Sequence, residues 1–459
     1  MSTSTQTPTE AQSTSLLGRR YRASTVGGVA LVFIAAFEAL AVATVMPTVA
    51  HDLGGERWYA LAFAATVATS VVGMVLAGLW ADRRGAAGPL LTSVALFGLG
   101  LLVAGLAPSM TELVVGRVMQ GLGAGGLTVA LYVLVAQVYD EADRPRILGA
   151  YAAAWVLPGI VGPLLAGTVT DLVGWRWVFL GLVGVSVVSA LLLVPTLVAL
   201  GNAPVDDAPV PAAGRGRRVV HSSVLAVAVL VASMVAGGGA TGALVGVAAA
   251  VVAVLAVRAL LPAGTLRAAR GLPAVVGVRG LASGTFVAAE AFLPYLLQVQ
   301  YDVAIWLSGL VLTGATLGWA AASHVQGRMP TSVSADARLL RIGGVNLVIG
   351  MSIVLVVTVL HLPGLIIGLG WVVTASGMGL IYPRVTSYAL ARAGASDRGT
   401  ASAAIALSDS TGAAIALAIA GFTFTALGGA DELGSFVAVL VITAGLAVLT
   451  AFVTRRADA

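Results

Sequence analysis

The sequence predicts an all-α, polytopic membrane protein, and its composition and apolar runs lead to that class. Of the 459 residues, 59% are hydrophobic and 10% are charged, and the mean hydropathy is +1.00. A soluble domain carries roughly a quarter charged residues, so a chain this apolar would expose large greasy patches in water. A backbone in lipid must form helices or a closed barrel. Barrel strands alternate apolar and polar residues over about ten positions. The runs here are continuous and about 20 residues long, the length that a helix needs to cross a bilayer, so we expect helices.

These runs divide the chain into two groups of six spans joined by a pair. We expect the first six spans near residues 25–48, 58–80, 90–107, 112–138, 147–171 and 176–200. We expect the pair near 221–238 and 241–261, turning on Gly237, Gly238 and Gly239, and the last six near 273–297, 303–323, 339–360, 363–386, 399–425 and 433–453. The total is 14 spans. Because the turn of the pair is so short, 12 spans plus a re-entrant segment is the alternative.

The same division predicts the order of domains. We expect a disordered cytoplasmic tail over 1–24, an N-terminal six-helix bundle over 25–200, a cytoplasmic linker over 201–220, an extra two-helix hairpin over 221–261, a C-terminal six-helix bundle over 262–453 and a cytoplasmic tail over 454–459. Two six-span halves around a basic linker are the layout of transporters built from repeats. A non-transporting membrane sensor or enzyme is the competing class.

The arginines predict the orientation, since all 25 basic residues are Arg. With the N-terminus inside, twenty arginines fall in cytoplasmic segments and only Arg57 and Arg176 fall outside. This is the positive-inside pattern, so we expect both termini on the cytoplasmic side of the cell's inner membrane. It also accounts for the pI near 9.9 without a nucleic-acid partner.

The residue types that are missing narrow the chemistry. The chain has no Cys, which excludes disulfides and thiolate metal sites, and its four histidines show no metal-ligand spacing. Without Lys it cannot form a nucleotide-binding loop of the Gly-x-x-x-x-Gly-Lys type. We therefore expect no metal, no cofactor and no direct use of ATP.

Three motifs in the first half carry a family resemblance. Gly78-Leu79-Trp80-Ala81-Asp82-Arg83-Arg84-Gly85 follows the second span, and Arg117-Val118-Met119-Gln120-Gly121-Leu122-Gly123 lies in the fourth. The fifth span holds Pro158-Gly159-Ile160-Val161-Gly162-Pro163-Leu164-Leu165-Ala166-Gly167, and Trp175-Arg176-Trp177 follows it. The first two resemble the span 2–3 loop and the span 4 motif of the major facilitator superfamily. The third resembles that family's antiporter signature, although Gly159 stands three positions before Gly162 and only one glycine ends the motif.

The first span is similar to that of the fourteen-span drug:proton antiporter branch of this family. Glu38 and Pro47 stand nine positions apart, the spacing of the acid and proline in that branch, with Glu replacing Asp. The run from Arg398 to Ser402 resembles the family's entry to the penultimate span. The resemblance implies a major facilitator fold with two extra central helices, and a proton-coupled exporter active in multidrug efflux and antibiotic resistance. It implies a conformational role for the loop after the second span, which we call the latch motif and which contains Gly78, Asp82, Arg83 and Gly85. It implies a second conformational role for a bent fifth span, with Pro158, Gly159, Gly162, Pro163 and Gly167.

Charges inside spans are the candidate proton-coupling groups. An ionisable side chain at this depth is costly unless it is paired or hydrated. Glu38 is our leading candidate, with Arg117 biasing its charge state; Glu290 and Asp409 are expected to form a second protonation site, to anchor a cationic substrate group, or both. Structural acids between helices, and an Arg117 that snorkels to the membrane surface, are the alternatives. Arg279 and Arg384 lie near inner ends of their spans.

Polar and aromatic residues in the spans are candidates for lining a binding cavity. They are Trp155, Tyr295, Gln298, Asn346 and Tyr382. A mostly apolar cavity with isolated acids suits drugs or other amphipathic, cationic compounds, so we predict proton-coupled antiport of such molecules by a monomer in the bilayer. A lipid or glycolipid transporter of the same fold is the alternative.

Overall fold

The computed structural model describes residues 15–201, 215–330, 332–392 and 398–457, and within these ranges the regular structure is helical. The tail over 1–14, the linker residues 202–214 and residues 458–459 lie outside the described residues. The first half contains α1 (Arg22–Asp52), α2 (Tyr59–Arg84), α3 (Ala87–Gly105), α4 (Met110–Val138), α5 (Arg144–Ala153), α6 (Val156–Val173) and α7 (Arg176–Leu200). The hairpin contains α8 (Arg215–Met234) and α9 (Gly239–Leu260). The second half contains α10 (Leu272–Gln300), α11 (Ile305–Gly327), α12 (Val333–Val359), α13 (Leu365–Arg392), α14 (Arg398–Ala426) and α15 (Leu433–Thr454).

Fourteen membrane-spanning helices confirm the predicted fold class. In the described chain, 14 helical segments are long and apolar enough to cross a membrane, with α5 and α6 forming one segment. The hairpin helices are among them, and at 22 residues α9 is about 33 Å long. The alternative of 12 spans with a re-entrant segment is therefore wrong. Helix α8 begins at Arg215, earlier than the expected span start at 221, so Arg217 and Arg218 lie on a helix.

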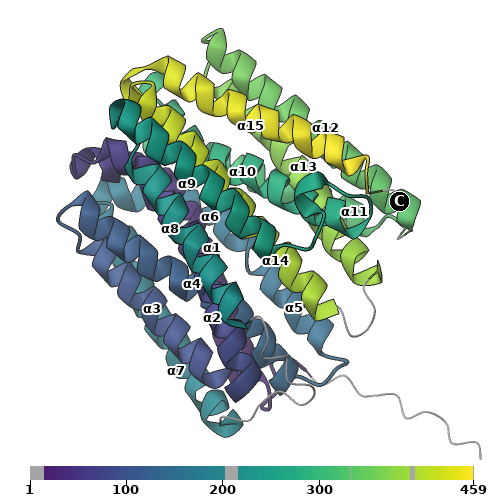
Figure 1. The fold of residues 1–459 in the computed structure, drawn as a ribbon. Coiled ribbons are helices and arrows are strands. Elements are labelled where there is room, and N and C mark those ends of the chain that lie inside the picture. Colours follow the sequence, from purple (N-terminus) through teal and green to yellow (C-terminus); the bar gives the residue numbers. More distant parts are fainter. Residues whose placement is uncertain (1–14, 202–214, 331, 393–397, 458–459) are drawn as a thin grey trace, which may run out of the picture.

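The helices form two halves with the hairpin beside them. Within the halves α4 packs on α2 and α3, α12 packs on α13, and α10 packs on α14. Between the halves α6 packs on α11, α2 on α14, and α1 on α10. Helix α8 packs on both α2 and α14, which places the hairpin along one of the seams between the halves (Figure 1).

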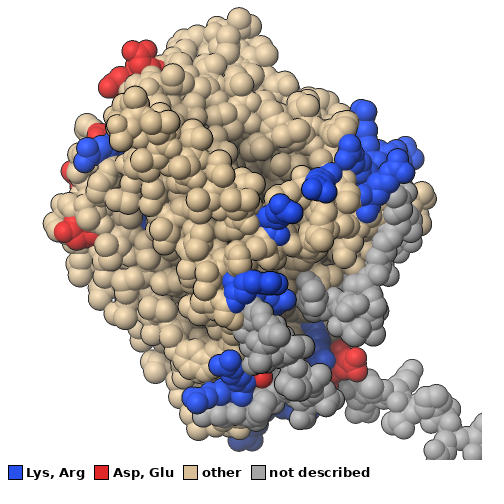
Figure 2. Space-filling model, viewed as in Figure 1, with Lys and Arg blue, Asp and Glu red and all other residues tan. Residues whose placement is uncertain are grey.

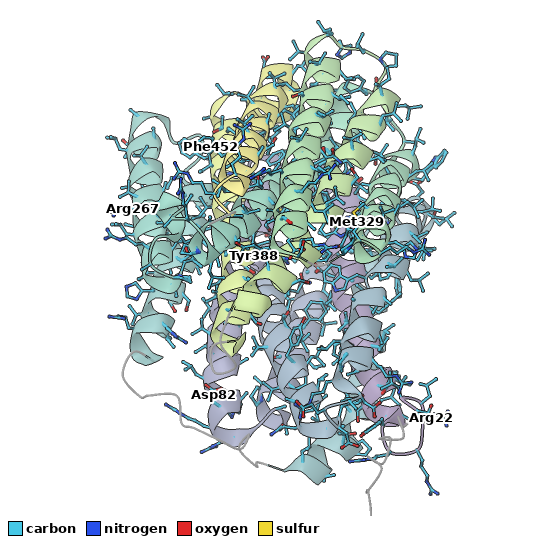
Figure 3. The ribbon with its side chains drawn as sticks, turned by 90° about the vertical axis from the view of Figure 1, so that its right-hand side faces the viewer. Arg22, Asp82, Arg267, Met329, Tyr388 and Phe452 are labelled. Atoms are coloured by element: carbon cyan, nitrogen blue, oxygen red, sulfur yellow. The ribbon has the colours of Figure 1, made fainter. Side chains whose placement is uncertain are left out.

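The two ends of the bundle differ in charge. We call the end where α1 begins and α15 ends the arginine-rich face, and the end where α1 ends and α2 begins the opposite face. Most blue side chains in Figure 2 lie along the lower-right side, where Figure 1 shows α15 ending. Figure 3 looks toward that side, with Arg22 and Asp82 of the first half below and Arg267 and Met329 of the second half above.

The halves are joined toward the opposite face. Among the described residues three hydrogen bonds cross between them: the Tyr59 hydroxyl donates to the Ala291 carbonyl, Gln298 Nε2 donates to the Thr44 carbonyl (3.0 Å), and the Thr313 hydroxyl donates to the Ile160 carbonyl (3.0 Å). All three lie in the middle of the bundle or nearer the opposite face. The bundle is thus closed at that face.

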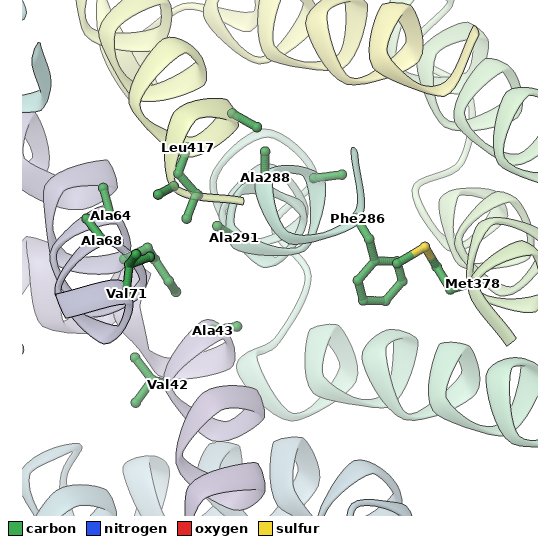
Figure 4. Packing of buried hydrophobic residues seen from close by; sticks show 14 of the residues in the cluster. Val42, Ala43, Ala64, Ala68, Val71, Phe286, Ala288, Ala291, Met378 and Leu417 are labelled. Atoms are coloured by element: carbon green, nitrogen blue, oxygen red, sulfur yellow. The ribbon is translucent and has the colours of Figure 1, made fainter. Parts of the chain in front are cut away.

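Small side chains let the central helices approach closely. Figure 4 shows Ala64, Ala68 and Val71 of α2 facing the region where Ala291 of α10 and Leu417 of α14 meet. A methyl group at Gly412 of α14 would collide with the Gly280 backbone of α10. Close backbone contact of this kind is how membrane helices gain packing energy when lipid is as apolar as the interface.

The fifth span is broken in two, and Pro158 supplies the reason. A proline lacks the N–H that would bond to the carbonyl four residues earlier, here that of Ala154. The chain leaves helical hydrogen bonding at Ala154 and Trp155, and α6 starts again at Val156 with Pro158 in its first turn, where proline is tolerated. The break exposes Trp155, whose side chain is 48% accessible.

Candidate functional site

A buried ion pair joins α1 and α4 in the first half. Arg117 Nη1 donates to Glu38 Oε1 and to Gln120 Oε1 (2.6 Å), and its Nε donates to the Ala62 carbonyl of α2 (3.1 Å). Glu38 and Arg117 are each only 3% exposed. Arg117 therefore does not snorkel to the surface, and the two charges compensate each other inside the bundle.

A second ion pair lies in the other half and is less enclosed. Arg279 Nε of α10 donates to Asp409 Oδ1 of α14 (2.7 Å), and the hydroxyl of Tyr382 of α13 donates to the same oxygen (2.7 Å). The guanidinium lies 3.4 Å from the centre of the Tyr382 ring, a cation–π contact. The side chains of Arg279 and Asp409 are 15% and 30% exposed. Three helices thus meet at one carboxylate that remains reachable.

Glu290 is the intramembrane acid without a compensating charge. It lies on α10, three turns beyond Arg279, and is partly exposed. Within the described residues it forms no hydrogen bond or ion pair. A carboxylate in this position must take up a proton, bind a cation or draw in water, because an isolated charge in an apolar medium is costly.

An aromatic wall stands one helical turn from Glu290. Phe286 stacks on Trp371 of α13, with ring centres 4.5 Å apart, and meets Trp319 of α11 edge-on at 5.3 Å. Trp319 also contacts the Tyr382 ring at 4.9 Å. The wall therefore runs from the neighbourhood of Glu290 to the Arg279–Asp409 pair. Aromatic faces next to acids suit lipophilic cations.

Comparison with known proteins identifies the family of the chain. Residues 28–417 match the Major Facilitator Superfamily. The chain belongs to the major facilitator superfamily.

The relatives of this major facilitator chain align over part of their length. An uncharacterized MFS-type transporter of Mycobacterium tuberculosis, Rv1877, is 34% identical over 173 residues, covering 38% of this chain and 25% of the relative. Multidrug resistance protein 3 of Bacillus subtilis is 28% identical over 148 residues, covering 32% of this chain and 29% of the relative. The aligned part thus spans about a quarter of the length of each. The crystal structure of a peptide transporter, POT, with sulfate has a TM-score of 0.67 at 16% identity, covering 96% of this chain and 95% of that one. This similarity concerns the fold alone.

The latch motif ends α2 at the arginine-rich face. Gly85 has a φ of 72°, which favours glycine, and its N–H closes the helix on the Ala81 carbonyl at 2.8 Å. Asp82 and Arg83 are exposed in the last turn, and Gly78 lies one turn earlier. The next residue, Ala86, donates its N–H to Gln137 Oε1 of α4 (3.0 Å). Sequence reasoning missed Gln137, whose side chain fixes this loop.

The fifth-span motif forms the contact between α6 and α11, one of the seams between the halves. A methyl group at Gly159 would collide with Thr316, and one at Gly167 would press on the backbone of Trp306. Pro163 packs against Gly309 of α11 in the same way. Pro158 is buried, and Gly162 faces Phe37 of α1. These glycines and prolines therefore form much of the contact between α6 and the other half.

The residues expected to line a cavity are spread over the bundle. Tyr382 contacts Asp409, and Trp155 is exposed at the α5–α6 break. Tyr295 is buried beside Tyr59, with ring centres 4.3 Å apart, and Gln298 bonds to Thr44, so both belong to the closed end. The fifth residue lies between α12 and α13, where Asn346 donates to the Ser376 hydroxyl (3.1 Å). The structure thus brings Tyr382 to the Asp409 cluster and keeps the other four apart from it.

Sequence reasoning also missed a third buried charge pair. Arg384 of α13 donates to Asp336 Oδ1 of α12 (2.5 Å) and to Gln326 Oε1 of α11 (2.6 Å). It also donates to the Met329 carbonyl (3.1 Å), so it fixes the connection between α11 and α12. The sequence places Arg384 near the inner end of its span, and only the tertiary structure identifies these partners.

Proposed function

We propose that this protein exports amphipathic, cationic small molecules in exchange for protons by alternating access, with its arginine-rich face in the cytoplasm. The proposal rests on the surroundings of Glu290, which is an unpaired, partly exposed acid beside an aromatic wall. The other two central acids, Glu38 and Asp409, are already neutralised by arginines. Glu290 is therefore the group whose charge has to be balanced by a cation or a proton.

Competition between the substrate cation and a proton for the Glu290 carboxylate couples substrate export to proton entry. When the bundle is closed at the opposite face, a cationic group entering from the arginine-rich side binds to Glu290 and displaces its proton into the cytoplasm. After the halves rock, a proton from outside neutralises Glu290 and the cation loses its partner. Either ligand alone compensates the charge, so the transporter changes state only when one of them is bound.

The ion pairs have different roles in this cycle. Glu38 remains a proton-coupling residue in the proposal, because its protonation would release Arg117 from α1 and loosen the contact between α1 and α4. In the state closed at the opposite face, Arg117 holds the Glu38 carboxylate away from solvent, so we place the first exchange at Glu290. Asp409, with Arg279 and Tyr382, lies along the entry path as the second acidic site. The latch and the α6–α11 motif serve as the moving contacts between the halves.

The distribution of arginines supports an orientation of the protein in the membrane. Arginines gather at the face where α15 ends, and positive charge is retained on the cytoplasmic side of a membrane. We propose that both termini are cytoplasmic, that the protein lies in the cell membrane, and that one copy is the transporting unit. Multidrug transporters among the relatives support an amphipathic substrate class.

Purified protein in vesicles with an imposed pH gradient tests the proposal. A panel of lipophilic cations is added, and proton movement is followed by a pH-sensitive dye in wild type, Glu290→Gln and Glu141→Gln. Glu141 is exposed at the arginine-rich face and serves as the matched control acid. We expect cation-triggered proton movement in wild type and Glu141→Gln, and loss of it in Glu290→Gln. Full coupling in Glu290→Gln would reject the proposal.

A further inference from the structure

The hairpin carries an apolar groove that the transport cycle does not use. The groove lies between Ser223 and Val231 of α8 and between Val245 and Val252 of α9, and its volume is about 440 Å³. Apart from Ser223, its lining consists of valine and alanine. We call it the hairpin groove. Val224, Val227 and Val252 are exposed along it, so it opens toward the lipid and away from the central helices.

The length of the groove along the helix axis is close to the thickness of one leaflet of a bilayer. Ser223 and Val231 are eight residues apart on α8, about 12 Å along a helix axis. Half of a hydrocarbon core about 30 Å thick is about 15 Å. Its Ser223 end lies toward the arginine-rich face, because α8 begins there. The groove lies over the middle of α9, and its Ser223 end is the part that an acyl chain of the leaflet next to that face reaches first.

Three arginines lie between the groove and the end of the hairpin at the arginine-rich face. Arg217 and Arg218 are on α8, and Arg258 is on the returning α9; all three are exposed. In the described part of the chain none of them has an acidic partner. Arg218 stands five residues before Ser223, about 8 Å along the axis, which is the reach of a phospholipid headgroup above its chains.

We propose that the hairpin groove binds an anionic phospholipid, with an acyl chain between α8 and α9 and the phosphate against Arg217, Arg218 and Arg258. Basic side chains just outside a span attract anionic headgroups, and the groove supplies the apolar part of the same site. A second copy of the protein is a poorer occupant. Two copies in one bilayer share an orientation, so their arginines would meet at the same depth and repel each other.

Lipid binding to the full chain in a neutral detergent tests this site. The probes are dioleoyl phosphatidylglycerol, dioleoyl phosphatidylcholine and inorganic phosphate alone, and native mass spectrometry gives the bound lipid and its apparent Kd. We expect wild type to bind phosphatidylglycerol more tightly than phosphatidylcholine. Each arginine removed should weaken phosphatidylglycerol binding about fivefold, and the triple change Arg217→Gln/Arg218→Gln/Arg258→Gln roughly 100-fold. Arg328→Gln, an exposed arginine on the loop after α11, should bind as wild type does.

A groove-filling pair of variants tests the apolar half of the site. Ala248→Trp occupies the groove, whereas Val247→Trp adds the same ring to the exposed lipid face of α9 outside it. We expect only Ala248→Trp to weaken phosphatidylglycerol binding, and both proteins to keep the wild-type unfolding temperature without lipid. Equal binding of the two lipids, equal effects of the two tryptophans, or saturation of the site by inorganic phosphate would overturn the proposal. So would a dimer that Ala248→Trp dissociates while phosphatidylglycerol binding stays unchanged.

Discussion

Tyr59 of α2 donates its hydroxyl hydrogen to the carbonyl of Ala291 of α10, one residue after Glu290. The bond joins the two halves where the bundle is closed, and it belongs to the state in which the opposite face is sealed. A neighbouring aromatic contact, between the rings of Tyr59 and Tyr295, strengthens the same closure. The candidate site and this closing contact thus share one segment of α10.

Tyr59→Phe should shift the protein toward the state that is open at the opposite face. The change removes one hydrogen bond, worth about 1 kcal/mol net, so the ratio of the two states should change about fivefold. Because the chain has no Cys, spin labels at Leu106→Cys and Leu360→Cys, both exposed at the opposite face, report the distance between the halves. An unchanged distance distribution would show that this hydrogen bond does not keep the opposite face closed.

Glu38→Gln should destabilise the fold more than Asp409→Asn. Both changes leave an arginine without its partner, but Arg117 is almost fully enclosed and Arg279 is partly exposed. Breaking a buried pair costs about 3–5 kcal/mol, and the more exposed pair should cost about 1–3 kcal/mol. Thermal unfolding in detergent measures which of the two variants is less stable. Glu38→Gln/Arg117→Gln should recover much of the loss, and a double variant as unstable as Glu38→Gln would show that the ion pair is not the cause.

Gly412→Ala should separate α10 from α14. Its methyl group meets the backbone of Gly280, which cannot move as a flexible side chain can, so we expect a loss of about 1–3 kcal/mol in stability. Gly181→Ala on α7 is the matched control, because a methyl group there meets only open space. Equal unfolding temperatures for the two variants would contradict the packing described for these helices.

Arg384→Gln should loosen the connection between α11 and α12 without stopping cation-triggered proton movement. The side chain bonds to Asp336, Gln326 and the Met329 carbonyl at the arginine-rich face, away from Glu290. Limited proteolysis after the exposed Arg328, in vesicles and with wild type as reference, measures the loosening. Faster cleavage together with retained coupling is the expected result; loss of coupling would give Arg384 a place in the transport cycle.

The fold was predictable from the sequence because the signals that carry it are local. Continuous apolar runs predict spans, and the 14 helices agree with the prediction, including both helices of the hairpin. The break in the fifth span is also a local effect, since Pro158 removes one hydrogen bond from its own helix. The start of α8 was not predicted, because the arginines of its first turn are also typical of a cytoplasmic loop.

The site was predictable only in part, because its contacts join distant segments. Glu290 and Asp409 stand out as acids in apolar runs, but the sequence does not tell which of them is paired. Asp409 meets an arginine 130 residues away, and Glu290 meets none in the described chain. Nothing in the sequence singles out Tyr59, because its link to α10 depends on how the two halves pack.

Helix α8 makes the two seams between the halves unequal. It packs on α2 of one half and α14 of the other, whereas α6 and α11 meet each other directly, through the glycines and prolines of α6 and the bond from Thr313 to Ile160. Any rocking that separates α2 from α14 must slide α8 along one of them. At the α6–α11 seam the helix that touches both partners is α1, which belongs to the first half itself. In the proposed cycle the hairpin would therefore slow the separation of one seam more than the other. We expect changes in the lipid around the hairpin to alter the speed of transport rather than the choice of substrate.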